Sequence, residues 1–139
     1  MFKPQSLISF PTSKALLALA AFSLLVACAV SPATQAKIDE YTRTIPSCAG
    51  AAECQAKWRM ATAWVEANSD FGIRSASDTR IVSTTNVASD SGIAIVVERI
   101  PTTNGRFQIK VDMECLSGYG CPQLWDNMVE FNRAVNTAN

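Results

Sequence analysis

The chain has 139 residues, of which 48% are hydrophobic and 17% charged, and this length suits one globular domain but not two. Twelve Lys and Arg residues balance twelve Asp and Glu residues, so the chain lacks the basic excess with which proteins bind nucleic acid. Histidine is absent, which excludes His-based catalytic triads, His general bases and His metal ligands.

The N-terminal residues 1–27 have the features of an export signal. Lys3 and Lys14 carry positive charge, and the run 15–27 that follows them is uncharged and mostly apolar. That run is shorter than the ~20 residues with which a helix spans a bilayer, and Pro32 limits its extension as helix. We therefore predict a signal peptide rather than a membrane-spanning segment.

The apolar run ends in Leu25-Val26-Ala27-Cys28, which resembles the lipobox of bacterial lipoproteins. The resemblance implies cleavage before Cys28, acylation of its sulfur and of the new N-terminus, and a lipidated tether over residues 28–35. Two or more acyl chains hold a protein stably on a membrane, and Ala29 in place of an Asp after the cysteine favours the outer membrane. The alternative is a secreted protein with a chance cysteine.

Two helices are predicted at the start of the mature chain. The first covers residues 33–44 and ends ahead of Pro46, whose ring disfavours helix in the preceding residue. The second covers residues 51–68, which are rich in alanine and contain neither Gly nor Pro. Its apolar residues recur at three- and four-residue steps; they are Cys54, Trp58, Ala61 and Val65, with Met60 and Trp64 beside them.

The pattern then changes to that of strands. Residues 72–77 and 79–85 are rich in Ile, Val, Ser and Thr, and they predict two short strands or one strand that bulges around Asp78. Residues 86–92 are expected to form a loop. Residues 93–100 are apolar on both faces at first, as in a central strand.

A β-hairpin is the most specific tertiary prediction. Asn104-Gly105 is a strong turn signal, and residues 106–115 after it alternate strictly between the two faces of a strand. The apolar face holds Phe107, Ile109, Val111, Met113 and Cys115, and the polar face holds Gln108, Lys110, Asp112 and Glu114.

A last helix is predicted over residues 123–135, after a loop at 116–120 and a proline at position 122, where a first-turn proline is tolerated. The order of elements is then α-α-β-β-β-α, with room for one more strand. We predict a small α+β domain over residues 36–139, in which helices pack on a three- to four-stranded antiparallel sheet.

With Cys28 assigned to lipid, four cysteines remain, in two pairs with C-x₅-C spacing: Cys48, Cys54, Cys115 and Cys121. Four cysteines allow three disulfide connectivities. We favour Cys48–Cys54 and Cys115–Cys121, because each pair brackets a predicted loop-to-helix junction. A zinc site or a redox-active pair would have C-x-x-C spacing, which is absent.

Few residues suggest catalysis. Asp112 and Glu114 lie two apart on one strand face and are candidates for acid–base work, but alternating charge with Lys110 on a solvated face is the commoner arrangement. Residues 117–120 (SGYG) do not match the G-x-S-x-G nucleophile motif. With no phosphate, dinucleotide, calcium or zinc motif, we expect no enzyme activity, no cofactor and no metal.

Two features suggest binding instead. Trp58, Trp64 and Trp125 are candidates for an aromatic platform; because Trp58 and Trp64 lie about 120° apart around a helix, we expect Trp58 and Trp125 in the core and Trp64 partly exposed. The second feature is the loop of Leu116, Ser117, Gly118, Tyr119 and Gly120. A disulfide would preorganise this loop, and tyrosine is favoured at recognition surfaces, although such loops often serve only to turn the chain.

The segments 48–70 and 111–136, which contain the two C-x₅-C pairs, resemble small uncharacterised proteobacterial lipoproteins. The resemblance implies lipidation at Cys28 and the local disulfide pairing, but no activity or ligand. We therefore expect a lipid-anchored cell-envelope protein that acts as a non-catalytic binding or accessory module for an envelope protein or a glycan. A small envelope hydrolase and a structural envelope lipoprotein are the alternatives.

Overall fold

The computed structural model describes residues 30–83 and 92–139. The predicted signal peptide, Cys28 and most of the predicted loop 86–92 lie outside the described residues. The chain divides into two units, residues 1–31 and 32–139, and every described helix and strand belongs to the second. These elements are α2 (Pro32–Thr44), β1 (Ser47–Ala49), α3 (Ala51–Asn68), β2 (Ile73–Ala76), β3 (Arg80–Ser83), β4 (Ile93–Pro101), a 3₁₀ turn (Thr103–Gly105), β5 (Arg106–Cys115) and α4 (Leu124–Asn136).

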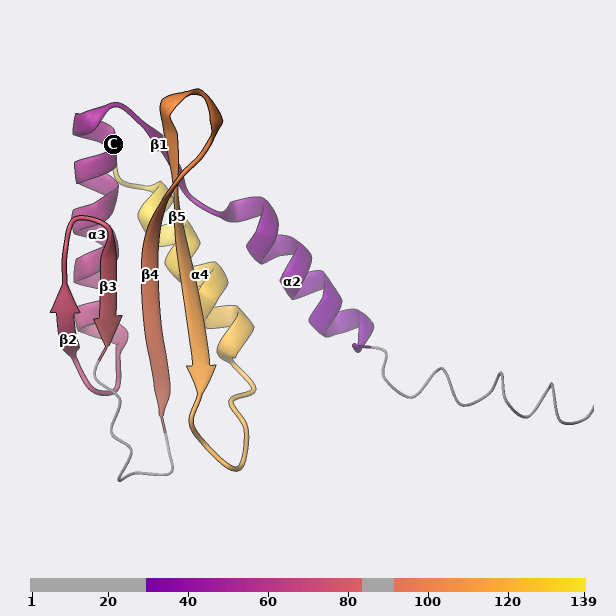
Figure 1. Ribbon diagram of the computed structural model, residues 1–139. Coiled ribbons are helices and arrows are strands. Elements are labelled where there is room, and N and C mark those ends of the chain that lie inside the picture. Colours follow the sequence, from indigo (N-terminus) through magenta and orange to yellow (C-terminus); the bar gives the residue numbers. More distant parts are fainter. Residues whose placement is uncertain (1–29, 84–91) are drawn as a thin grey trace, which may run out of the picture. The chain divides into compact units, whose positions relative to one another are not determined.

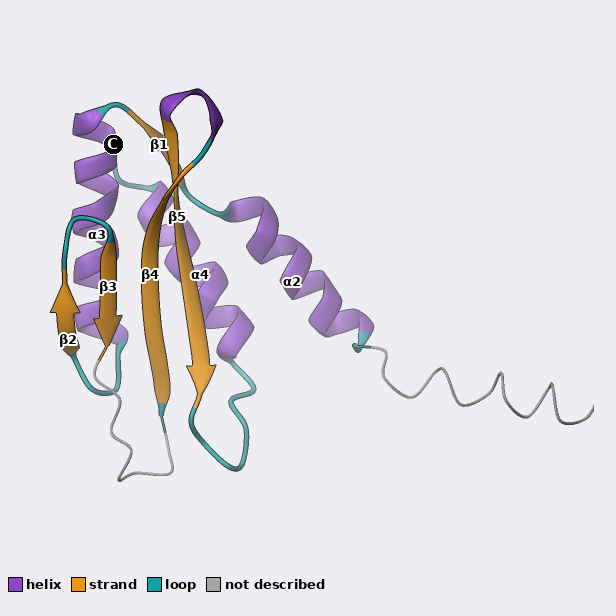
Figure 2. Cartoon of the chain, viewed as in Figure 1, coloured by secondary structure: helices purple, strands orange, loops and turns teal. Residues whose placement is uncertain are grey.

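The second unit is an α+β domain with two disulfides, as predicted. Its five strands form one antiparallel sheet in the order β1-β5-β4-β3-β2. The helices lie on one side of this sheet, and the strands β4 and β5 face the viewer in Figure 1 and Figure 2. Helix α4 packs against β5, α2 and α3, so it is the centre of the helical layer.

The predicted number and order of strands were wrong. The sheet has five strands rather than three or four, and the order is α-β-α-β-β-β-β-α rather than α-α-β-β-β-α. Strand β1 was missed because three residues are too short to show a two-residue period; its pairing with the edge of β5 creates it. Two short strands formed around Asp78, because the Ser77 hydroxyl accepts hydrogen bonds from the N–H groups of Thr79 and Arg80 and turns the chain.

The helix over 51–68 and the β-hairpin are confirmed. Helix α3 has the predicted bounds, and β5 alternates between buried and exposed residues as expected. Asn104 and Gly105 both adopt positive φ angles, of 66° and 69°, which their turn requires. The core between the sheet and the helices is built from both faces, with Ile81, Ile95, Val97, Ile109 and Val111 from the sheet and Ala61, Val65, Met128, Phe131 and Val135 from the helices.

Polar contacts fix α2 to the rest of the domain. The fully buried Asn132 of α4 donates its Nδ2 protons to the carbonyl oxygen of Tyr41 and to Thr44 Oγ1, and Asn136 Nδ2 donates to the Thr44 carbonyl. These bonds satisfy carbonyl groups at the end of α2 that have no partner within the helix. Because α2 begins at Pro32, residues 32–35 of the predicted tether are helical.

The phenol of Tyr41 connects α2 to the sheet. Its hydroxyl donates to the carbonyl oxygen of Val111 at 2.6 Å in a buried position. Burial raises the pKa of Tyr41 to about 12, and the negative charge of Asp112 adds to the shift.

Among the described residues, none of the helices is both long and apolar enough to cross a membrane.

Candidate functional site

The two disulfides lie at the two ends of the domain, and each has its own surroundings. Cys48 is bonded to Cys54 and Cys115 to Cys121, with Cα–Cα distances of 5.1 Å and 5.7 Å. The local pairing is therefore confirmed. Each ring spans a sequence separation of six, yet the two surroundings differ.

The first ring joins β1 to α3 and is internal. Cys48 is fully buried and Cys54 is 4% exposed. Gly50 lies between them with a φ of 81°, a left-handed conformation that residues with a Cβ rarely adopt. The ring thus holds the start of α3 against the sheet.

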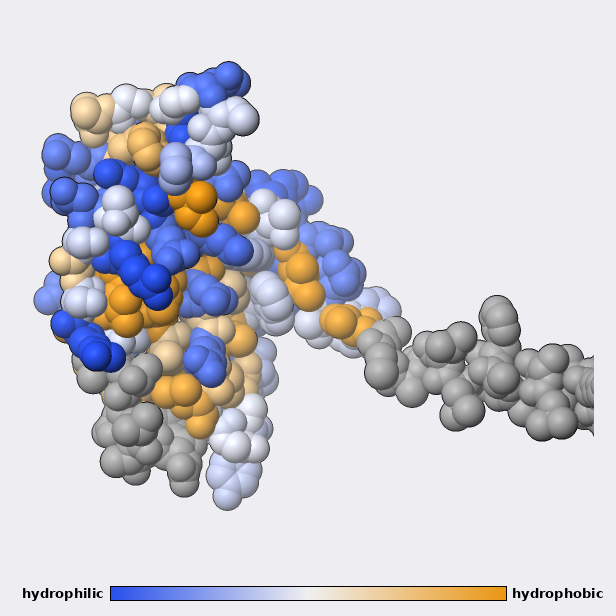
Figure 3. Space-filling view, in the orientation of Figure 1, coloured by the Kyte–Doolittle hydropathy of each residue, from blue (hydrophilic) through white to orange (hydrophobic). Residues whose placement is uncertain are grey.

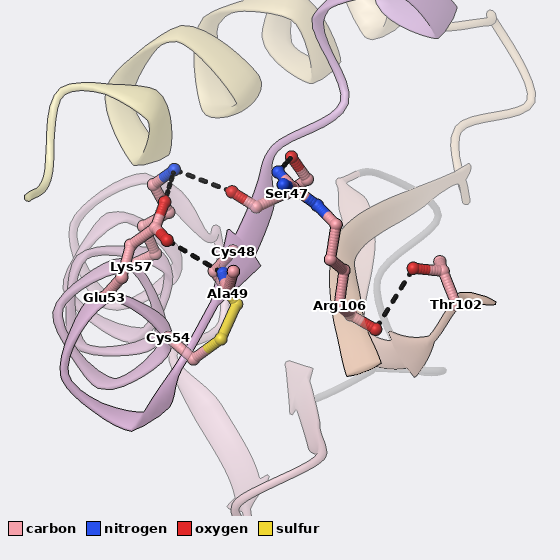
Figure 4. The surroundings of a disulfide bond; sticks show 8 residues. All are labelled: Ser47, Cys48, Ala49, Glu53, Cys54, Lys57, Thr102 and Arg106. Atoms are coloured by element: carbon pink, nitrogen blue, oxygen red, sulfur yellow. Dashed lines mark hydrogen bonds and ion pairs between the residues drawn. A yellow bond between two sulfur atoms is a disulfide. The ribbon is translucent and has the colours of Figure 1, made fainter. Parts of the chain in front are cut away.

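A charged network surrounds this first ring (Figure 4). Glu53 accepts hydrogen bonds from the Ala49 N–H and from Lys57 Nζ, each at 2.8 Å, and the buried Lys57 also donates to the Ser47 carbonyl at 2.7 Å. The bond from Lys57 is the main cause that lowers the pKa of Glu53, and the bond from the Ala49 N–H adds to it. Since its polar groups satisfy one another, this region is structural.

The second ring carries the predicted binding loop, which extends past the end of β5 (Figure 1). Within the loop, Ser117 accepts hydrogen bonds from the Tyr119 N–H on its Oγ, at 3.2 Å, and from the Gly120 N–H on its carbonyl, at 3.1 Å. The Leu116 N–H donates to the Gly92 carbonyl at 3.0 Å. The side chain of Tyr119 is 101% exposed. A closed, hydrogen-bonded loop therefore holds a tyrosine in solvent.

A shallow hollow of about 290 Å³ lies beside this loop, between Ser117, Gly120 and Gln123, the residue before α4. Gln123 and Asn127 also line a neighbouring hollow of about 350 Å³ that reaches the end of α3. Hollows and loop together form one surface at this end of the domain, which we call the loop end.

Trp64 was predicted to be partly exposed, and this prediction was wrong. The residue is 9% exposed, and its ring packs edge-on against Phe131 of α4, with ring centroids 5.3 Å apart. The error arose because α4 covers a second sector of α3, which no periodicity within α3 indicates. Trp58 and Trp125 are partly buried and pack at the margin of the core.

The carboxylates considered for acid–base chemistry lie on the open face of the sheet. Asp112 and Glu114 are exposed, and Lys110 pairs across the ladder with Glu98, which forms an ion pair with Arg80 at 3.0 Å. Hydrophilic residues dominate this face and surround small apolar areas (Figure 3). The arrangement is that of a solvated charged surface. Within residues 30–83 and 92–139, no three Cys, Asp or Glu side chains gather as metal ligands.

A third hollow, of about 420 Å³, was missed by sequence reasoning. Trp58, Arg99 and Phe107 line it, together with the start of α3. One feature of the sequence could have indicated it: Arg99 occupies the core-facing position that follows Ile95 and Val97 in β4. A charged residue at an inward position of a strand calls for a partner.

Comparison with known proteins gives no match for this chain among family models, curated proteins or solved structures.

Proposed function

We propose that the protein is a lipid-anchored component of a bacterial cell envelope, held in the outer membrane through Cys28, and that it serves as a non-catalytic binding or accessory module. Residues 1–27 would direct export and be removed. Two disulfides between neighbouring cysteines support this assignment, since disulfides persist in oxidising compartments outside the cytosol.

One observation carries the binding role: Tyr119 is fully exposed on a loop that a disulfide and internal hydrogen bonds hold in shape. A preordered loop loses less conformational entropy when a partner binds. Tyrosine gains much contact area when it is covered, and the adjacent hollow offers a recess for a partner's side chain. A protein or a glycan of the envelope fits this description.

The positions of the charged residues favour binding over turnover. Asp112 and Glu114, the carboxylates that a hydrolase of this sequence would use, lie on the open sheet face. Both are exposed to solvent and outside the hollows at the loop end. General acid catalysis needs a carboxyl group within hydrogen-bond reach of a bound substrate, and the hollow that Asp112 lines on this face is small, at about 190 Å³, and shared with Arg80 and Lys110.

The lipid anchor is tested by labelling cells with an alkyne-tagged fatty acid and separating membranes from soluble protein. The Cys28→Ser variant should lose both the label and the membrane association, whereas the control Ala29→Ser, which keeps the cysteine, should retain both. A Cys28→Ser protein that stays fully membrane-bound would contradict the anchor.

The binding role is tested by photo-crosslinking in cells, with the photoreactive residue at Tyr119 and a control at Lys110, followed by mass spectrometry of the adducts. One strong partner at Tyr119 but not at Lys110 is expected. Silence at Tyr119 would reject the loop as the binding surface, and adducts at Lys110 would place binding on the charged sheet face.

A further inference from the structure

Arg99 lies on the core-facing side of β4, at the hairpin end of the domain. Its guanidinium carbon is 5.9 Å from the ring centroid of Trp58 and 5.2 Å from that of Phe107. Both distances are within the range of cation–π attraction. The two rings, which come from α3 and β5, therefore hold the guanidinium in a fixed place.

This guanidinium has no anionic or hydrogen-bonding partner among the described residues. Its Nε is buried without an acceptor, whereas the exposed Arg80 and Arg133 form ion pairs with Glu98 and Glu40, respectively. Buried polar groups are almost always hydrogen-bonded, so this guanidinium lacks part of its usual complement of acceptors. Because Nε itself is closed to solvent, a ligand in the hollow would pair with the terminal Nη groups, for which no described residue supplies an ion pair.

The hollow in front of Arg99 has room for such a ligand. Its volume is about 420 Å³, and Gly50 and Ala51 form one wall. The N–H groups in the first turn of α3 have no acceptor within the helix, and they add positive potential to this wall, which the carboxylate of Glu53 in the same turn partly offsets. Arg99 and the helix end thus act on the same space.

Asp78 restricts the kind of anion. This residue also lines the hollow, and its carboxylate forms no ion pair with any described residue. A doubly charged phosphate would be repelled by it, whereas a singly charged carboxylate faces a weaker repulsion. A guanidinium and a carboxylate also match as a planar, two-bond pair.

We propose that this hollow, the Arg99 pocket, binds a small molecule or peptide terminus through its carboxylate, with the apolar part of the ligand against Trp58 and Phe107. The start of α3 and the turn between β4 and β5, which contribute to this pocket, lie at the opposite end of the domain from the loop after β5 (Figure 1). The proposal therefore goes beyond the binding role of the loop and does not depend on it.

Benzoate is a suitable probe because it combines a carboxylate with a flat apolar ring, and benzamide is its neutral control. The isotope-labelled protein, as isolated from the cells that make it, is titrated with each compound, and NMR follows the Trp58 indole N–H and the Arg99 Nε–H. Saturable shifts with benzoate, and binding of benzamide weaker by about tenfold or more, are expected. Equal binding of the two compounds, or no saturable shift at either group, would overturn the proposal.

Two variants locate the interaction. Arg99→Met should weaken benzoate binding by about tenfold or more, whereas Arg106→Met, which removes an exposed arginine of the same hairpin, should leave it unchanged. Equal losses in both variants would mean that the affinity comes from general positive charge, and would overturn the site.

Asp78→Asn tests the pocket without altering the core, because Asp78 is exposed, and it remains informative if Arg99→Met does not fold. Removal of the like charge should tighten benzoate binding by about threefold, and an unchanged or weaker affinity would contradict the proposal. The photo-crosslinks at Tyr119 should be unaffected, so failure of the pocket and failure of the loop are distinguishable.

Discussion

The two disulfide rings of this domain have the same size and opposite roles. The Cys48–Cys54 ring is buried, and it contains the start of α3. The Cys115–Cys121 ring is partly exposed, and α4 begins only at Leu124, after the ring has closed. The first fastens the chain inside the domain, and the second holds a loop outside it.

The residues within each ring explain the difference. Residues 49–53 (AGAAE) include three alanines, which favour helix, and Glu53, whose carboxylate lies in the first turn of α3. Residues 116–120 (LSGYG) include two glycines and no strong helix former apart from Leu116. The spacing of cysteines therefore sets the covalent ring, but the residues between them determine whether the ring is filled by a helix or projects as a loop.

Removal of each disulfide should separate the two roles most clearly. Opening either ring costs about 2 kcal/mol of unfolding free energy by the chain-entropy argument, since the rings have equal length. The pair Cys48→Ala and Cys54→Ala should cost about 1–2 kcal/mol more, because it also empties buried volume. Urea unfolding followed by circular dichroism measures both, with Cys115→Ala and Cys121→Ala as the matched control. Equal losses of unfolding free energy in the two pairs would show that burial of the first ring does not add to stability.

Lys57→Met should give the next largest effect. Lys57 is 8% exposed and supplies hydrogen bonds to the Ser47 carbonyl and to Glu53. Its loss leaves both acceptors without this donor, at a cost of about 2 kcal/mol. The control Lys110→Met, on the open sheet face, should change the unfolding free energy by less than about 0.5 kcal/mol. Similar losses of unfolding free energy in the two variants would show that the hydrogen bonds of Lys57 do not stabilise the region of the first ring.

Local patterns were sufficient for much of the fold. The alanine-rich period predicted α3 with its bounds, and Asn104-Gly105 with the alternation after it predicted the hairpin. The loop with Tyr119 was also predicted, because its glycines and flanking cysteines are neighbours in sequence. In each case, the residues that determine the structure belong to one element or to elements that are adjacent in the sequence.

The missed features all depend on contacts between distant segments. Strand β1 exists because β5 pairs with it, and Trp64 is buried because α4 covers it. The Arg99 pocket joins the ring of Trp58 to that of Phe107, which lies 49 positions later in the sequence. Periodicity describes one element at a time, so it cannot indicate which elements share a surface.

Acid should reduce the stability that the ionised Glu53 contributes near the first ring. The pKa of Glu53 is lowered in the folded state from its ordinary value of 4.5, so the folded state binds this proton less readily than the unfolded chain does. The resulting stability is fully present above about pH 4.5 and is lost as the pH falls through the lowered pKa. In urea unfolding at a series of pH values, Glu53→Gln and Lys57→Met should both lose less stability on acidification than the parent protein. An unchanged acid dependence in Glu53→Gln would contradict the assignment.

The smallest change in stability is expected at the second ring. Tyr119→Ala removes a side chain that is 101% exposed, so the free energy of unfolding should change by less than about 0.5 kcal/mol. The control Ser117→Ala should cost more, because it removes the hydroxyl that accepts the Tyr119 N–H. Capture of the partner, measured with a photoreactive residue at the neighbouring Gly118, should nevertheless fall strongly in Tyr119→Ala. A variant that is equally stable and equally able to capture its partner would show that the exposed tyrosine has no part in binding, and that the second ring, like the first, only shapes the chain.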